Sequence, residues 1–184
     1  MNHIATVALM LNFGVASIYG QQPVTMRFSG TSGASAINLQ QPNTTTDEWN
    51  VAGNGALGQF TFRNISADTT MPQQSSTCSG PTMLYFVMVA GGGVFRFQGG
   101  SLLKVNLTQG EVCVDLAAQE AHCTMTFNII GGTGRFKDAS GSLTYTETTL
   151  PVLADASNNP VFFASTGGVT GTVSGVAAEE GPQD

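Results

Sequence analysis

NIIGGTGRFKDASGSLTY, residues 128–145, places a glycine-rich break between two runs that alternate as β-strands do. The first strand must end abruptly, because consecutive glycines permit the positive φ of a chain reversal. An aromatic side chain after the turn can fold inward and plug the end of a β-barrel. A glycine just inside the second strand suits a bulge or a close approach to a neighbour. We therefore interpret the stretch as a corner between two long barrel strands, formed by Gly131, Gly132, Gly134, Phe136 and Gly141.

A phosphate-binding loop is the other use of such glycines, and the sequence argues against it. A Walker loop needs a lysine directly after its last glycine, and none is present here. In the dinucleotide pattern G-x-G-x-x-G, the third glycine position holds Lys137. Either loop must also lead into a helix, whereas residues 140–150 alternate Thr and Tyr as a strand does.

The rest of the chain predicts an all-β fold. Alternating runs such as residues 24–30 and 57–63 are separated by short Gly- or Pro-containing breaks, and residues 83–90 are apolar on both faces. Eight to ten such strands indicate a sandwich or a closed barrel. Two polar stretches, residues 40–56 and 66–81, are predicted to be loops that cover a barrel mouth. The first contains Trp49, either as an anchor on the barrel surface or as a lid over a ligand.

The corner also carries a resemblance to a known family. GGTGRFKDASG resembles the G-G-[TS]-G-x-F-x-x-A-x-G signature of the allene oxide cyclase and dirigent superfamily, above all its secreted bacterial-type members. The resemblance covers mainly residues 127–175 and includes the closing GGVTGTVSG. It implies a single eight-stranded antiparallel closed barrel, calycin-like, often exported and with an apolar cavity. No catalytic residue of the plant enzymes can be matched here, so the resemblance implies no activity.

Composition predicts the compartment and excludes one class of partner. Charged residues make up only 10% of the chain, and 23 glycines accompany many Thr and Ser residues, as in β-proteins displayed outside a cell. The net charge is −6, and the six basic residues are scattered. Nucleic acid is therefore excluded as a partner, because binding it requires clustered cations.

The N-terminus predicts export. Residues 1–20 contain a nearly uncharged apolar run that ends in small residues, as in a secretory signal peptide. An uncleaved anchor or a buried N-terminal helix are the alternatives. No second apolar run approaches the length of a membrane span, so the mature chain is expected to be secreted or periplasmic without a membrane association. The barrel domain is predicted over residues 21–176 and a disordered tail over 177–184.

Three cysteines fit an oxidising compartment and leave one thiol over. Cys113 and Cys123 flank a predicted hairpin tip, so a disulfide between them is the simplest pairing. Strand alternation, however, puts these two side chains on opposite faces unless a bulge intervenes. Pairing of Cys78 with either one therefore stays open. Sequons occur at Asn43, Asn64 and Asn106 and bear on glycosylation only in a host that carries it out.

Charged residues inside strands are the candidate ligand-binding residues, because the chain uses charge so sparingly. Arg27, Arg63 and Arg96 alternate with phenylalanines. If the phenylalanines line the barrel, the arginines point to solvent. In the alternative arrangement they project into a cavity and clamp a carboxylate or phenolate.

Glu147 is the candidate catalytic residue. It shares a strand face with Leu143 and Tyr145, so it is the acid most expected to point inward. Apolar surroundings would raise its pKa and suit it to general acid or base catalysis, with Tyr145 beside it as a candidate ligand contact. The alternative is a carboxylate that reaches water at a strand end. His122 is the only histidine of the predicted mature chain, so no zinc site is expected.

These observations predict three functions in order of preference. The first is a barrel that binds a small apolar or amphipathic ligand, and the second is a structural or surface protein whose barrel is filled by its own side chains. The third is a cofactor-free cyclase or dirigent-like enzyme. No cofactor and no metal are predicted, and assembly into a homo-oligomer is left open.

Overall fold

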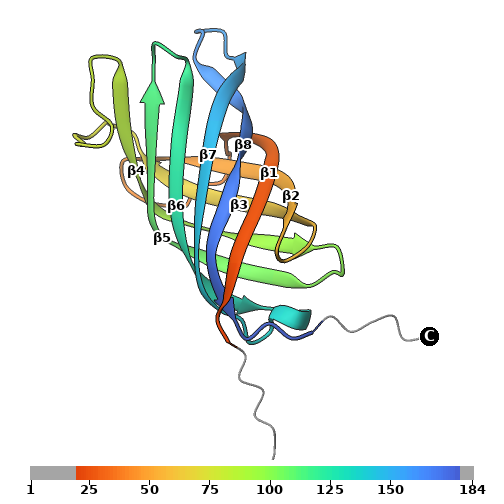
Figure 1. The fold of residues 1–184 in the computed structure, drawn as a ribbon. Helices are drawn as coiled ribbons and strands as arrows, with labels where there is room; N and C mark the ends of the chain where they lie inside the picture. Colours follow the sequence, from red (N-terminus) through yellow and green to blue (C-terminus); the bar gives the residue numbers. More distant parts are fainter. Residues whose placement is uncertain (1–19, 179–184) are drawn as a thin grey trace, which may run out of the picture.

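The computed structural model describes residues 20–178, which form eight antiparallel strands closed into a barrel (Figure 1). Each strand pairs with the next along the chain, and β8 closes the barrel by pairing with β1. This confirms the predicted eight-stranded closed barrel. The predicted signal peptide, except for Gly20, and most of the predicted tail lie outside the described residues. The strands are β1 (Gln22–Ala34), β2 (Thr44–Gly55), β3 (Phe60–Thr69), β4 (Met83–Phe97), β5 (Leu102–Asp115), β6 (Glu120–Gly132), β7 (Ser140–Ala154) and β8 (Pro160–Ser174).

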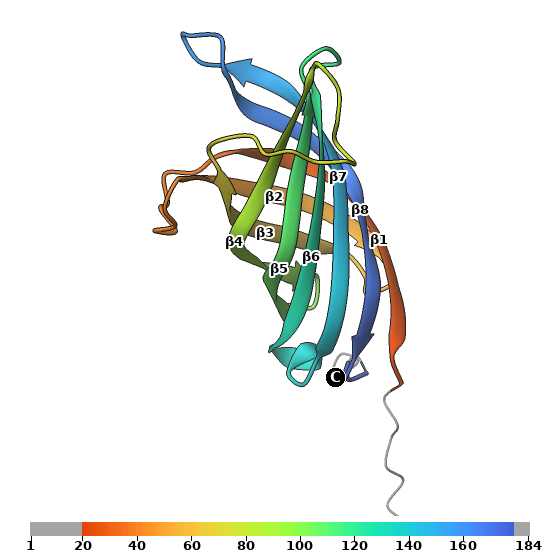
Figure 2. The ribbon, with the colours of Figure 1, turned by 90° about the vertical axis from the view of Figure 1, so that its left-hand side faces the viewer.

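The up-and-down topology gives the barrel two different ends. The β2–β3, β4–β5 and β6–β7 turns lie at the end where β1 begins and β8 ends, which we call the closed end. The connections over residues 35–43, 70–82, 116–119 and 155–159 lie at the other end, the mouth. The β7–β8 hairpin projects from the mouth, to one side of the β5–β6 hairpin (Figure 2). Within residues 20–178, no helix is long and apolar enough to cross a membrane.

Aromatic side chains fill the closed half of the barrel. Phe62 stacks on Phe95 with ring centroids 4.0 Å apart, and Phe28 stacks on Tyr145 at 4.4 Å. Alternation along each strand directs these side chains inward, and Phe62, Phe95 and Tyr145 are fully buried. The closed half is therefore a packed core rather than a channel.

The β6–β7 corner has the structure that its sequence predicts. A 3-10 turn, η1 (Gly134–Phe136), directs Phe136 into the barrel end, where it is fully buried and lies 4.7 Å from the Phe97 ring. Gly131 has φ 96°, as predicted. Gly132 is needed for a different reason, since a Cβ there would lie 2.0 Å from the Leu102 carbonyl oxygen.

Two predicted loops are partly strands. Residues 44–55 form β2, and β3 continues to Thr69, so only the outer parts of these stretches are loops. Trp49 accordingly lies on a strand, with its side chain buried inside the barrel rather than anchored on its surface. The polar composition misled the prediction, because alternating small polar residues also suit the mouth of a solvent-accessible barrel.

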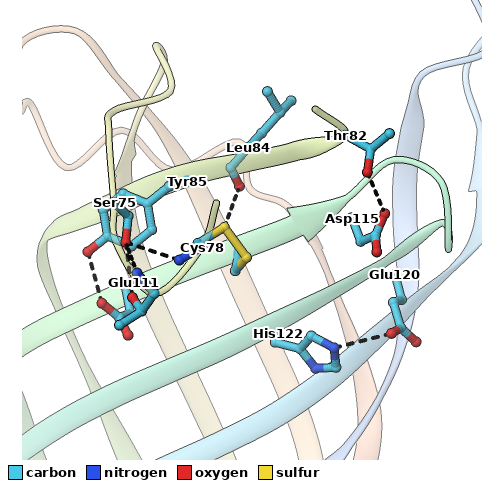
Figure 3. The surroundings of a disulfide bond; sticks show 11 residues. Ser75, Cys78, Thr82, Leu84, Tyr85, Glu111, Asp115, Glu120 and His122 are labelled. Carbon is cyan, nitrogen blue, oxygen red and sulfur yellow. Dashed lines mark hydrogen bonds and ion pairs between the residues drawn. A yellow bond between two sulfur atoms is a disulfide. The ribbon is translucent and has the colours of Figure 1, made fainter. Parts of the chain in front are cut away.

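The disulfide joins Cys78 to Cys113, so the predicted Cys113–Cys123 pair is wrong (Figure 3). Cys123 is a free, buried thiol on the inner face of β6, whereas the inner face of β5 carries the neighbours of Cys113, Val112 and Val114. Alternation therefore separates Cys113 from Cys123, because no bulge brings them to one face. The bond ties the β3–β4 connection to the outside of β5, where the Tyr85 hydroxyl donates to Glu111 at 2.8 Å.

Candidate functional site

The mouth half of the barrel contains a cavity of about 590 Å³ to which all eight strands contribute. Its walls are mainly apolar. Its floor lies at Trp49, Cys123 and Glu147, because the next inward-facing residue below Glu147, Tyr145, belongs to the packed core and does not line the cavity. The apolar wall residues include Leu84, Phe86, Val112, Val114 and Phe163.

Glu147 is the central polar group of this floor. Its side chain is buried, and it accepts hydrogen bonds from Trp49 Nε1 at 2.5 Å and from the Tyr145 hydroxyl at 2.7 Å. The Cys123 thiol and the Ser165 hydroxyl also contact it. Burial raises the pKa of Glu147, and these hydrogen bonds oppose the rise only in part. The floor therefore holds a carboxyl group that favours its neutral form more than an exposed glutamate does.

A second acidic group lies across the cavity from β7, on β2 and β3. Asp68 is buried, accepts a hydrogen bond from the Ser66 hydroxyl at 2.6 Å and shares a hydrogen bond with Asp47. Burial and the neighbouring Asp47 charge raise the pKa of Asp68 to about 7. Burial also raises the pKa of Asp47, while the hydrogen bond from Asp68 lowers it. The two carboxyl groups are thus set to share one proton, with Asp68 as the donor.

The predicted site residues fall into two groups. Glu147 points into the barrel as predicted, and Tyr145 lies beneath the floor and bonds to it. Arg27, Arg63 and Arg96 are exposed on the outside, where they alternate with inward-facing phenylalanines, and none of them lines the mouth cavity. Of the two arrangements considered, the structure therefore has the one in which the three arginines point to solvent. The prediction that they bind a ligand inside the barrel is wrong.

The sequence analysis missed the Asp47–Asp68 pair. Both residues lie in stretches predicted to be loops, although Asp47 continues the inward alternation of Trp49 and Val51. A register shift between Ala67 and Asp68 interrupts the pattern of β3. The alternation of β2 could therefore have predicted that Asp47 points inward. The inward position of Asp68 could not be predicted without knowing the register between β3 and β4.

Other sequence features take no part in the cavity chemistry. His122 is exposed, on the face opposite Cys123, and contacts Glu120 at 3.2 Å and Thr148 at 3.1 Å. Among residues 20–178, no three His, Cys, Asp or Glu side chains are placed to hold one metal ion. Of the three sequons, Asn43 and Asn106 are exposed, but Asn64 is buried inside the barrel and closed to modification once the protein has folded.

No family model and no curated protein matches the chain. Among solved structures, the chain resembles the pterocarpan synthase dirigent protein GePTS1 with a TM-score of 0.43 and 11% identity, over 89% of this chain and 90% of that one.

Proposed function

We propose that the protein binds a small amphipathic molecule in the mouth cavity. The observation that supports this most directly is the division of the interior, which is packed with aromatic rings in the closed half and hollow at the mouth. A cavity of about 590 Å³ lies within the range of roughly 300–1,000 Å³ typical of small-molecule sites. Apolar walls over a hydrogen-bonding floor suit a ligand with an apolar body and one polar group.

We also propose that the chain is exported. The Cys78–Cys113 bond is of the kind that persists in oxidising compartments. This agrees with the apolar N-terminal segment, which lies outside the described residues.

The structural alternative, a barrel filled by its own side chains, is supported for the closed half only. The catalytic alternative has a specific observation in its favour, because Glu147 and Asp68 are buried carboxyl groups with raised pKa values in one cavity. A neutral carboxyl group there could donate a proton to a bound substrate, as a cofactor-free cyclase or dirigent-like enzyme requires. Such catalysis presupposes ligand binding, which is therefore tested first.

The test uses the uncharged fluorophore N-phenyl-1-naphthylamine. We expect saturable binding of one molecule per chain, accompanied by quenching of Trp49, the only tryptophan of the chain and a residue of the cavity floor. Ala121→Phe should weaken binding by about tenfold or more, because it fills the cavity from β6. Ala52→Phe is the matched control, since Ala52 is exposed on β2 and does not line this cavity. Absence of saturable binding, or equal weakening by both substitutions, contradicts the proposal.

A further inference from the structure

Charge is strongly segregated along the barrel axis. The mouth half comprises residues 31–49, 66–88, 111–124 and 147–165, and none of these segments contains a lysine or an arginine. All six basic residues of the chain belong to the closed half. Of the nine acidic residues within the described part of the chain, only Asp138 lies in the closed half. The other eight are Asp47, Glu48, Asp68, Glu111, Asp115, Glu120, Glu147 and Asp155.

Three of these acids, Glu147, Asp68 and Asp47, line the mouth cavity. The charges of Glu147, Asp68 and Asp47 all raise the pKa of the Cys123 thiol, although its burial is the larger cause. The three acids come from β7, β3 and β2 and line the same cavity as Cys123. Within residues 20–178, none of these three carboxyl groups forms an ion pair with a basic side chain.

A buried carboxylate is stable only with a positive partner or a proton. In the described part of the chain, residues 20–178, no lysine or arginine lines this cavity to provide a positive partner, and the walls around the acids are mainly apolar. The three acids are not arranged to ligate one metal ion, and an apolar wall suits a hydrocarbon body better than a hydrated ion. A ligand that joins an ammonium group to an apolar body complements both features.

We propose that the ligand of this cavity is an amphipathic organic cation, a small apolar molecule with a protonated amine that reaches Asp68 and Glu147. This inference rests on the proposed binding function and specifies its ligand class. Asp115 and Glu120 line the mouth above the floor, so the approach to the cavity is also negative. Such a field attracts cations, repels carboxylates and weakens with added salt.

The experiment compares three ligands that share one skeleton: 4-phenylbutylamine, 4-phenylbutan-1-ol and 4-phenylbutanoate. Each competes against N-phenyl-1-naphthylamine at pH 7. We expect the amine to displace the fluorophore at a concentration about tenfold lower than the alcohol. A hydrogen bond to a charged group contributes more binding free energy than a neutral one, and the difference corresponds to about tenfold in affinity. The carboxylate should be the weakest competitor, and added salt should reduce only the advantage of the amine.

Two substitutions locate the effect. Asp68→Asn and Glu147→Gln should each reduce the preference for the amine over the alcohol, compared within the same variant, by about threefold or more. Glu48→Gln is the matched control, because Glu48 lies in the mouth half but is exposed and does not line the cavity. The affinity for the alcohol verifies that each variant is folded. If either variant fails to bind the alcohol, Asp47→Asn replaces it.

Calorimetry in two buffers of different ionisation enthalpy measures how many protons are released when a ligand binds, and it does so in the unmodified protein. Binding of the amine should release protons from the groups that face the cavity floor, Asp47 on β2, Asp68 on β3 and Glu147 on β7, whereas the alcohol should release none. Cys123 and Tyr145 keep their protons, because burial raises the pKa of both groups.

The outcomes separate the two proposals. If the fluorophore binds and the alcohol or carboxylate competes as well as the amine, the cation inference is wrong and the binding function stands. If calorimetry and fluorescence detect neither the fluorophore nor the amine, both are wrong. If the amine is preferred but Glu48→Gln lowers that preference as much as Asp68→Asn, the assignment to the cavity floor is wrong.

Discussion

Asp68→Asn should change how the free energy of unfolding depends on pH. The pKa of Asp68 is raised from 3.8 to about 7, chiefly by burial, so the folded protein holds a proton that the unfolded chain loses. A group whose pKa is raised by folding stabilises the protein most below its unfolded pKa. That stabilisation declines as the pH rises and is fully lost above the folded pKa.

The magnitude follows from the size of the shift. A difference of about three pKa units corresponds to about 4 kcal/mol over the whole range, of which about 3 kcal/mol falls between pH 5 and pH 8. Asparagine keeps the side chain's shape, can accept the Ser66 hydroxyl and can donate to Asp47, but it does not titrate. The variant should therefore gain about 3 kcal/mol relative to the wild type between pH 5 and pH 8.

Urea unfolding at both pH values, without reductant and without ligand, measures this difference. Glu147, whose pKa burial also raises, adds a loss of stability with rising pH that is common to the wild type and the variant. Glu48→Gln, which removes an exposed carboxylate from the same half of the barrel, should differ from the wild type equally at the two pH values. A constant difference between wild type and Asp68→Asn would refute the buried, proton-holding role of Asp68.

Three further outcomes are expected. Cys113→Ser should lower the free energy of unfolding by about 4 kcal/mol in urea, because the lost bond closes a loop with a sequence separation of 35 residues; a loss below about 1 kcal/mol would argue against the Cys78–Cys113 pairing. The thiol of Cys123 should react with an aromatic disulfide reagent only after unfolding, because it is buried, and fast reaction in the folded protein would contradict this. Phe136→Ala should cost about 3–5 kcal/mol, against less than about 1 kcal/mol for Phe162→Ala on the exposed hairpin, and equal losses would show that Phe136 is not a core plug.

Local sequence patterns were enough to predict the barrel fold and part of the candidate site. The alternation of Phe60 and Phe62 with Thr61 and Arg63 correctly separated two faces, because side-chain direction in a strand has a period of two, but it left open which face is buried. The same rule placed Glu147 inside. The glycines of the β6–β7 corner were readable because positive φ and close backbone contact are properties of a few adjacent residues.

Only the closed barrel determines which residues from distant strands lie close together. Asp47, Asp68 and Glu147 come from three strands, and they share a cavity only because the register of each strand pair and the joining of β8 to β1 bring them to one level. The choice of Cys78 over Cys123 as the partner of Cys113 depends in the same way on where the β3–β4 connection crosses β5. A one-residue change of register reverses every side chain of a strand. For that reason the packed core was predictable strand by strand, whereas the acidic floor of the cavity is a property of the assembled barrel.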